Sequence, residues 1–335
     1  MSNVNGKTVR NLALDFTKGV LVLFMVLYHW INYFISTEGY VYRYLRFITP
    51  SFIFITGFLI TQAYLAKYDV HDPRLPKRLL QRGIKILVMF TLLNLGASLV
   101  SPKSHEGSSF GFSSLPAYLV SLYVPEAGRA ATFQVLVPIG CLLILCSGLL
   151  LMRRWFDYSI YATCAILFAG IFVADVCGWV NGTLELVGIG LLGVYLGNIP
   201  TATINRLLPY SPAVLLAYGA YLAAVSIWDV IYPLQVVGVC LSLLLIYLAG
   251  TICRSEGFVE TRILMLGRYS LLAYIAQIVV LQLLVRLLHA VQVQGWKLTI
   301  SFLGALLLTQ FAVEIVEWGR TRSKTADGLY RTMFA

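Results

Sequence analysis

LALDFTKGVLVLFMVLYHW, residues 12–30, is an apolar run that carries three groups which a simple membrane anchor does not need: Asp15, Lys18 and His29. A charged side chain inside a membrane helix costs about 3 kcal/mol on insertion scales, so each such residue indicates a functional site. Lys18 and His29 are eleven residues apart, which is about three helical turns and about 16 Å, so they share one face. The stretch predicts a membrane helix with a cation near one surface and an imidazole much deeper.

The rest of the chain repeats this apolar character. Of its 335 residues, 59% are hydrophobic and 12% are charged, whereas soluble domains carry roughly 25% charged residues. Several runs reach about the 20 residues needed to cross a bilayer. The predicted spans are 12–35, 46–66, 84–101, 131–152, 158–178, 183–199, 211–228, 233–253, 263–288 and 298–318. We therefore predict an all-α, polytopic integral membrane protein with about ten transmembrane helices in a single domain, 1–335.

The basic residues favour one orientation of these spans. With both termini in the cytoplasm, most of the 25 Lys and Arg residues fall on the inner side, as the positive-inside rule requires. This distribution explains most of the net charge of +10 without a nucleic-acid partner. Basic inner loops also attract anionic lipid head groups. A chain of this kind without a targeting peptide fits a bacterial cytoplasmic (inner) membrane.

The six cysteines and four histidines give no sign of a metal site. The cysteines lie in or at the ends of apolar runs without a CxxC pair, so neither a disulfide framework nor a zinc site is predicted. Apart from His29, the histidines lie in or near expected loops without ligand spacing. We expect no metal and no bound cofactor.

The first apolar run supports two interpretations. Asp15 and Lys18 are three residues apart and can neutralise each other on a helix, or they can form a simple charge cluster at the cytoplasmic surface. His29, between Tyr28 and Trp30, is either a catalytic group in the outer half of the bilayer or part of an interfacial aromatic belt. Gly19 would let a helix or a ligand approach the backbone closely.

Three further segments carry polar or charged groups. Arg78 and Arg82 lie four residues apart at the expected start of a helix, with Lys85 beside them. They are either ordinary positive-inside residues or a phosphate clamp, because arginine makes bidentate contacts with phosphate.

A polar stripe on one helical face is formed by Ser270, Tyr274 and Gln277, and it either holds helices together or lines a cavity. Near the end of the last span, Glu314 and Glu317 are expected to pair with Arg320 or Arg268.

Several of these segments together resemble one family. Arg10-x-x-x-Leu14-Asp15-x-x-Lys18-Gly19 followed by His29 resembles the first-helix motif of the transmembrane acyltransferase superfamily, which has arginine where this chain has Lys18. The segment 46–60 resembles the second span of this superfamily, and 77–87 resembles the basic entry to its third span. The segments 133–145 and 184–199 resemble the branch related to heparan-α-glucosaminide N-acetyltransferase, and 266–277 resembles a closing motif shared by several branches, including the glucan-modifying one and acyltransferase family 3-like sequences. In the closing segment, Gln277 stands where some relatives have histidine.

The resemblance implies a membrane-bound, glycan-modifying acyltransferase that takes an acetyl or other acyl group from cytoplasmic acyl-CoA. The acceptor would be a sugar or glycan, or a glycolipid, on the outer side of the membrane. His29 would be the general base or the acyl carrier, with Asp15 and Lys18 completing the catalytic set. Acyl-CoA, here acetyl-CoA, would be a donor substrate and not a bound cofactor. The residues expected to bind substrate and CoA are Arg78, Arg82, Lys85, Ser270, Tyr274 and Gln277.

The main alternative is a proton- or ion-coupled membrane transporter with Asp15, Lys18 and His29 as relay groups. Transporters often contain paired repeats with broken helices in corresponding positions. The clearest mid-span proline, Pro138, has no counterpart in the second half of the chain. A glycan-export component without chemistry is a third interpretation. The sequence leaves the acceptor, O- versus N-transfer, the acyl chain length and the oligomeric state open, and a homodimer is compatible with it.

Overall fold

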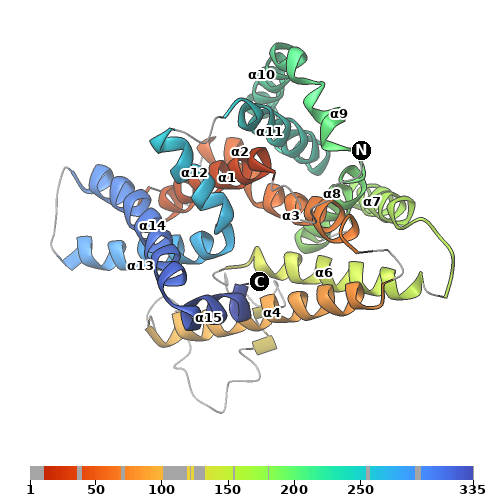
Figure 1. Ribbon diagram of the computed structural model, residues 1–335. Coiled ribbons are helices and arrows are strands. Elements are labelled where there is room, and N and C mark those ends of the chain that lie inside the picture. Colours follow the sequence, from red (N-terminus) through yellow and green to blue (C-terminus); the bar gives the residue numbers. More distant parts are fainter. Residues whose placement is uncertain are drawn as a thin grey trace. The chain divides into compact units, whose positions relative to one another are not determined.

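A computed structural model describes residues 11–35, 40–68, 72–100, 119–120, 122–123, 133–153, 155–179, 181–253, 257–290 and 296–334. The regular elements of these residues are helical (Figure 1). The helices are α1 (Leu12–Phe34), α2 (Tyr40–Leu45), α3 (Ile48–Leu59), α4 (Arg74–Val100), α6 (Leu136–Met152), α7 (Ile160–Val176), α8 (Gly182–Leu196), α9 (Thr201–Asn205), α10 (Ser211–Ile227), α11 (Tyr232–Ile252), α12 (Phe258–Arg268), α13 (Ser270–Ala290), α14 (Lys297–Arg322) and α15 (Lys324–Phe334). A π-helix, η1 (Ile60–Leu65), continues α3, and a short 3₁₀ helix, η5 (Leu208–Tyr210), precedes α10.

The prediction of an all-helical, polytopic membrane protein is confirmed. Within the described residues, seven helical segments are long and apolar enough to cross a membrane: Leu12–Phe34, Val41–Leu65, Arg74–Ser98, Leu208–Ile227, Tyr232–Ile252, Ser270–Leu288 and Lys297–Arg322. Three shorter apolar helices, α6, α7 and α8, lie where the sequence predicted further spans. The orientation of the termini stays a prediction.

Polar residues directly before apolar runs define where several helices begin. The side chain of Asn11 accepts a hydrogen bond from the backbone N–H of Leu14 at 3.1 Å and caps α1. Asn181 caps α8 in the same way, with a 3.0 Å bond from the N–H of Leu184. Such caps satisfy backbone donors that the first helical turn leaves unpaired.

The structure differs from the predicted spans at two positions. α4 begins at Arg74, about ten residues before the predicted start at 84, because the basic stretch continues the helix beyond its apolar part. The predicted span 263–288 consists of two helices, since the chain turns at Tyr269 (φ −110°, ψ 29°) between α12 and α13. The first five residues of α12 are FVETR, and the charged Glu260 and Arg262 among them favour a position outside the apolar core of the membrane.

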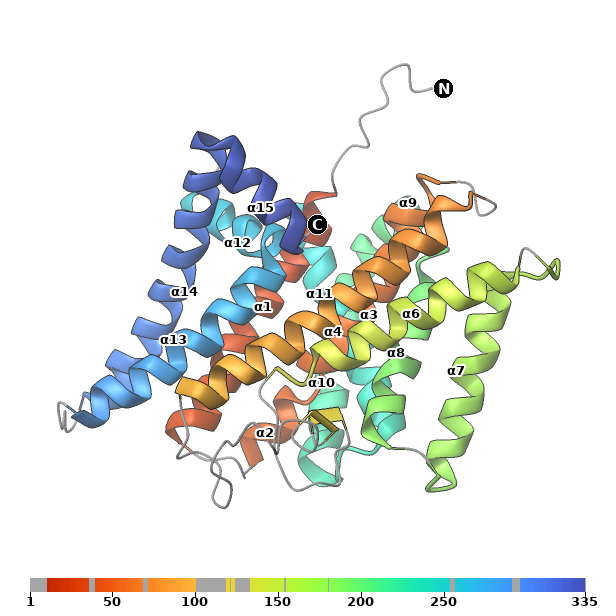
Figure 2. The ribbon, with the colours of Figure 1, turned by 90° about the horizontal axis from the view of Figure 1, so that it is seen from below.

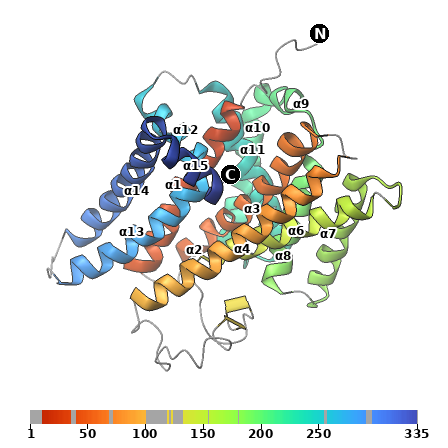
Figure 3. The ribbon, with the colours of Figure 1, turned by 60° about the horizontal axis from the view of Figure 1, so that its bottom comes forward.

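The chain divides into two compact units, residues 1–52 with 200–335 (the first unit) and residues 53–199 (the second unit). In the first unit, α1 packs against α11, α12, α13 and α14. α13 and α14 lie side by side as an antiparallel pair (Figure 3). In the second unit, α4 lies along α6, and α8 contacts α6 and α7 (Figure 2).

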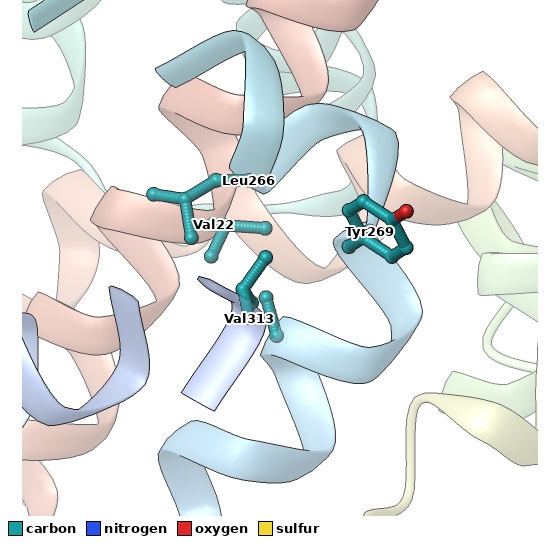
Figure 4. Packing of buried hydrophobic residues seen from close by; sticks show 5 residues of the cluster. Val22, Leu266, Tyr269 and Val313 are labelled. Atoms are coloured by element: carbon teal, nitrogen blue, oxygen red, sulfur yellow. The ribbon is translucent and has the colours of Figure 1, made fainter. Parts of the chain in front are cut away.

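Two hydrophobic clusters form the core of the first unit around α1. The first cluster joins Val22 of α1 to the α12–α13 junction and to α14 (Figure 4); its buried members are Val22, Leu266, Tyr269, Ala273 and Val313. The second cluster lies further along α1; its buried members are Val26, Leu281, Leu284 and Ala305. Both clusters therefore connect the same three helices, α1, α13 and α14, at successive levels.

Glycine residues allow the closest helix crossings. A Cβ atom on Gly267 of α12 would collide with the backbone carbonyl of Asp15, and one on Gly19 would collide with that of Ile263. The backbones of α1 and α12 are therefore in direct contact, as small residues permit in membrane proteins. In the second unit, a Cβ atom on Gly193 of α8 would collide with the backbone of Phe54 in α3.

The last helix, α15, is bound to the end of α14 by a network of charged and aromatic side chains. Arg320 donates hydrogen bonds to Asp327 Oδ1 from Nε (2.8 Å) and Nη2 (2.6 Å), and Arg331 contacts Asp327 Oδ2 at 2.7 Å. The guanidinium of Arg320 lies 4.0 Å from the ring centroid of Tyr330. The ring of Tyr330 in turn meets that of Tyr269 at 5.3 Å.

We expect the contact of α15 to be pH-dependent. The hydrogen bond from Arg320, helped by the charge of Arg331, lowers the pKa of Asp327 below its usual value, which is about 3.9 in an unfolded chain. Ionised Asp327 therefore stabilises the bound helix above about pH 4, and this contribution is lost as the pH falls through the lower folded-state pKa. Amide hydrogen exchange of 324–334 should rise, beyond the intrinsic pH effect, between pH 6 and pH 3.

The matched variant for this prediction is Asp327→Asn, which cannot carry the charge at any pH. It should show the faster exchange of 324–334 already at pH 6. Equal protection of wild type and Asp327→Asn at pH 6 would contradict the role assigned to the carboxylate.

Candidate active site

The charged pair at the start of α1 is the first part of the candidate site. The Nζ atom of Lys18 lies 2.7 Å from Oδ1 of Asp15, and the two side chains are 15% and 7% exposed. The predicted pairing of these residues is confirmed. Their position beside the α1–α12 crossing follows from Gly19 and Gly267, which bring the two backbones together. Removing one partner of so buried a pair is strongly unfavourable, since the other charge is left uncompensated.

His29 lies on α1 in a setting of aromatic rings. Its imidazole centroid is 5.2 Å from the ring of Tyr28 and 6.2 Å from the ring of Tyr274 in α13. Tyr28 also packs on Tyr42 of α2, with 4.9 Å between the centroids. We call Tyr28, His29, Tyr42 and Tyr274 the aromatic cluster. Among the described residues, the imidazole forms ring contacts and no hydrogen bond.

Neighbouring bonds fix the part of α1 that carries His29. Trp30 Nε1 donates a 2.8 Å hydrogen bond to Ser301 Oγ of α14. Gln282 of α13 donates a 3.3 Å hydrogen bond to the hydroxyl of Tyr33. α1 is therefore hydrogen-bonded to α14 and to α13 close to the imidazole.

Of the predicted polar stripe of α13, only Tyr274 belongs to the aromatic cluster. Tyr274 is 6% exposed and its ring faces His29. Gln277 is fully buried, and no partner for its amide atoms is present in the described part of the chain. Ser270 is the first residue of α13, beside Tyr269, and only partly buried.

The predicted basic cluster lies in the second unit, where tyrosine rings support it. The guanidinium of Arg78 lies 4.7 Å from the ring centroid of Tyr68. Arg82 donates a hydrogen bond to the hydroxyl of Tyr64, and its guanidinium lies 5.8 Å from that ring. Lys85 is exposed on the same helix, α4. The predicted helical placement of Arg78 and Arg82 on one face is confirmed.

Sequence reasoning missed the two tyrosines. Their signal was present, because Tyr64 and Tyr68 have the same four-residue spacing as Arg78 and Arg82. Tyr64 lies in the π-helix η1, an element that occurs frequently at functional sites. Stacking occupies the face of a guanidinium and leaves N–H groups at its edge, which can bind phosphate oxygens.

The two glutamates of α14 are paired. Glu314 pairs with Arg262 of α12 and accepts a 2.9 Å hydrogen bond from Gln310. Glu317 accepts a hydrogen bond from the hydroxyl of Tyr269 and lies 3.5 Å from Arg268. Arg268 is therefore a partner of Glu317 as expected, whereas the pairing with Arg262 was not predicted. Glu314 therefore connects α14 to α12, and Glu317 connects α14 to the α12–α13 junction.

The described residues contain no group of three or more His, Cys, Asp or Glu side chains that could hold a metal ion. The side chains of the candidate site are the imidazole of His29, the tyrosine hydroxyls, the amide of Gln277 and the clustered cations. These groups suit proton transfer and the binding of a phosphorylated ligand.

His29 lies in α1 and the basic cluster lies at the start of α4, and both helices are long and apolar enough to cross a membrane. A model of the acyltransferase domain family matches residues 11–313. The chain belongs to this family, acyltransferase family 3, and is thus a membrane acyltransferase. No curated protein and no solved structure matches the chain.

Proposed function

We propose that the protein transfers an acyl group, acetyl in the first instance, from cytoplasmic acyl-CoA to a hydroxyl or amine of a sugar, glycan or glycolipid on the outer side of the membrane. The observation that carries the proposal is His29, which lies among tyrosine rings three helical turns beyond the Asp15–Lys18 pair in a chain of this family. The arrangement offers a base deep in the helix bundle and cations nearer one end.

In the proposed step, His29 takes the proton of the acceptor hydroxyl or amine as the oxygen or nitrogen attacks the thioester carbonyl. The carbonyl oxygen becomes an oxyanion, and the C–S bond then breaks as the carbonyl re-forms. The CoA thiolate leaves and takes the proton back from the imidazolium. In the alternative order, the imidazole first attacks the thioester and carries the acyl group to the acceptor.

Tyr274 is the proposed hydrogen-bond donor to the oxyanion. Its ring faces His29 from α13, and a pre-positioned donor stabilises charge that develops in the transition state. Lys18, held by Asp15, lies about 16 Å before His29 along α1. We assign this pair to the path of the donor and not to proton transfer, since this distance is too long for a direct proton transfer to the imidazole.

The phosphorylated head of the donor is assigned to Arg78, Arg82 and Lys85. Arg78 and Lys85 are exposed on α4, and the stacked guanidiniums present N–H edges suited to phosphate. The two arginines therefore supply most of the expected affinity for the head group.

The double variant Arg78→Gln/Arg82→Gln should lower the affinity for CoA at least about tenfold, since each lost charge-assisted hydrogen bond removes roughly 1.5–3 kcal/mol. The salt dependence of binding should also become shallower, because fewer charges contribute. Titration calorimetry in nanodiscs at two salt concentrations measures both quantities. The matched control is Arg206→Gln, another exposed arginine. Equal loss in the control would show that overall charge, and not this cluster, binds the donor.

Sealed proteoliposomes test the proposed function as a whole. Labelled acetyl-CoA is supplied outside, and a mixture of oligosaccharides is trapped inside. The proposal expects acylated saccharide in the lumen, formed only by molecules whose basic face is outside. A coupled transporter would move solute without consuming acyl-CoA. Intact acetyl-CoA after prolonged incubation, with longer acyl-CoA donors giving the same result, would contradict the proposal.

A further inference from the structure

Gln277 of α13 and Thr309 of α14, which we call the polar layer, are buried at 0% and 1% exposure. Neither amide atom of Gln277 nor the hydroxyl oxygen of Thr309 has a hydrogen-bond partner among the residues that the structure describes. These three atoms of Gln277 and Thr309 therefore lie inside the core of the first unit without partners in the described part of the protein.

The polar layer lies between the two hydrophobic clusters around α1. On α13, Gln277 lies one turn after Ala273 of the first cluster and one turn before Leu281 of the second. On α14, Thr309 lies one turn from Ala305 of the second cluster and one turn from Val313 of the first. Figure 4 shows Val313 beside Val22 in the first cluster. Both polar residues therefore occupy the same intermediate level of one three-helix core.

An unpaired amide at this level is unfavourable. A buried polar group without a hydrogen bond loses its hydration without compensation. The bilayer around the helices supplies no water to replace the missing partner. Native proteins contain few such groups, and each calls for a ligand, a water molecule or a functional reason. Apolar residues occupy the adjacent turns at Ala273 and Leu281, so the packing alone gives no reason for glutamine at 277.

The polar layer lies close to the aromatic cluster that contains His29. Tyr274 precedes Gln277 by three residues, which is about 4.5 Å along α13, and its ring faces His29. A molecule bound at Gln277 would therefore lie within about one helical turn of the aromatic cluster. The following inference rests on the proposed function. Because Gln277 and Thr309 are buried, only a thin segment of a bound molecule could reach them.

We propose that the polar layer binds a secondary amide in the pantetheine arm of the acyl-CoA donor. Gln277 needs both an acceptor for its N–H and a donor for its carbonyl oxygen. A secondary amide supplies both, whereas a thioester carbonyl only accepts. A sugar ring carries several hydroxyl groups and would need more partners than the three unpaired atoms of the layer. The layer contains no charge, which suits the neutral arm and not the phosphates.

The test uses the full chain in nanodiscs and the isosteric variants Gln277→Met and Thr309→Val. Three probes separate the parts of the donor: CoA, pantetheine as the arm without the head, and adenosine 3′,5′-bisphosphate as the head without the arm. Gln277→Met should lower the affinity for CoA and for pantetheine about tenfold, the value expected for one lost hydrogen bond. The affinity for the bisphosphate should not change. Thr309→Val should act in the same direction.

Thermal unfolding without ligand gives an independent readout. Because the amide of Gln277 has no partner in the free protein, Gln277→Met should unfold at the same or a higher temperature. The matched control is Gln310→Met on α14, whose amide is already bonded to Glu314; it should unfold earlier and keep its affinity for pantetheine.

Three results would overturn this inference. Unchanged affinity of Gln277→Met for CoA and pantetheine, with wild type binding both, rejects the assignment of the arm. A lower unfolding temperature of Gln277→Met with unchanged affinity assigns the amide to an internal water or structural bond. Equal weakening of bisphosphate binding shows a global effect. If wild type binds none of the probes, the proposed acyl-CoA donor itself fails, which is a separate outcome.

Discussion

His29→Ala should abolish acyl transfer while the protein still folds and binds acyl-CoA. A positioned general base contributes typically about 10²–10⁴-fold to a rate, so we expect at least about a hundredfold loss in turnover. The ring is partly buried between Tyr28 and Tyr274, and it has no hydrogen bond to another described residue whose loss would disturb the fold. Turnover, measured as CoA release, and CoA affinity, measured by calorimetry, separate catalysis from binding.

His29→Gln is the matched variant, because it keeps a polar side chain of similar size but cannot carry a proton at neutral pH. It should be as inactive as His29→Ala. Tyr274→Phe, which keeps the ring contact and removes the hydroxyl, should reduce turnover less and leave CoA affinity unchanged. Substantial turnover by His29→Gln would show that the imidazole is only a member of an interfacial aromatic belt.

Gly267→Val should cause the largest loss of stability. The new Cβ would meet the carbonyl oxygen and carbon of Asp15 and the backbone nitrogen of Gly19. Backbone atoms on both sides cannot move aside as a flexible side chain can, so α12 has to separate from α1. Overpacking typically costs 1–3 kcal/mol, and we expect about 3 kcal/mol or more here. The measurement is the unfolding temperature in detergent by fluorescence-detected size-exclusion chromatography.

Gly219→Ala is the control for that substitution. Gly219 lies in α10, and a Cβ atom there would meet no atom within 4 Å. Alanine in an open helical position is favoured over glycine by roughly 0.5–1 kcal/mol, so this variant should be as stable as wild type or slightly more so. A Gly267→Val protein with wild-type stability would show that α1 and α12 do not touch.

Much of the fold could be predicted from the sequence because the length and the apolar composition of a segment identify it as a membrane span. The ten predicted runs agree with seven long helices and three shorter apolar ones among the described residues. The break at Tyr269 could not be predicted, since the apolar run continues across it and the turn depends on how Gly267 packs on α1. α15 was missed because its polar composition gives no span signal and its position depends on Arg320 and Asp327.

The candidate site was predictable where spacing on one helix decided it. The Asp15–Lys18 pair and the shared face of Arg78 and Arg82 required only the helical period. Two features depend on how helices pack, which no local pattern encodes. They are the ring contact between His29 and Tyr274 and the contacts of tyrosine rings with the basic cluster. Thr309 was missed for the same reason, because a lone threonine in an apolar run gives no signal until its neighbours are known.

The most direct test of the catalytic role of His29 is CoA release from acetyl-CoA by purified wild-type protein in nanodiscs, beside His29→Gln. We expect slow release by wild type, faster release when a saccharide serves as acceptor, and at least about a hundredfold slower release by His29→Gln. Equal release by both proteins would contradict the role of His29. No release and no binding of acyl-CoA by wild type would contradict the assignment of acyl-CoA as the donor.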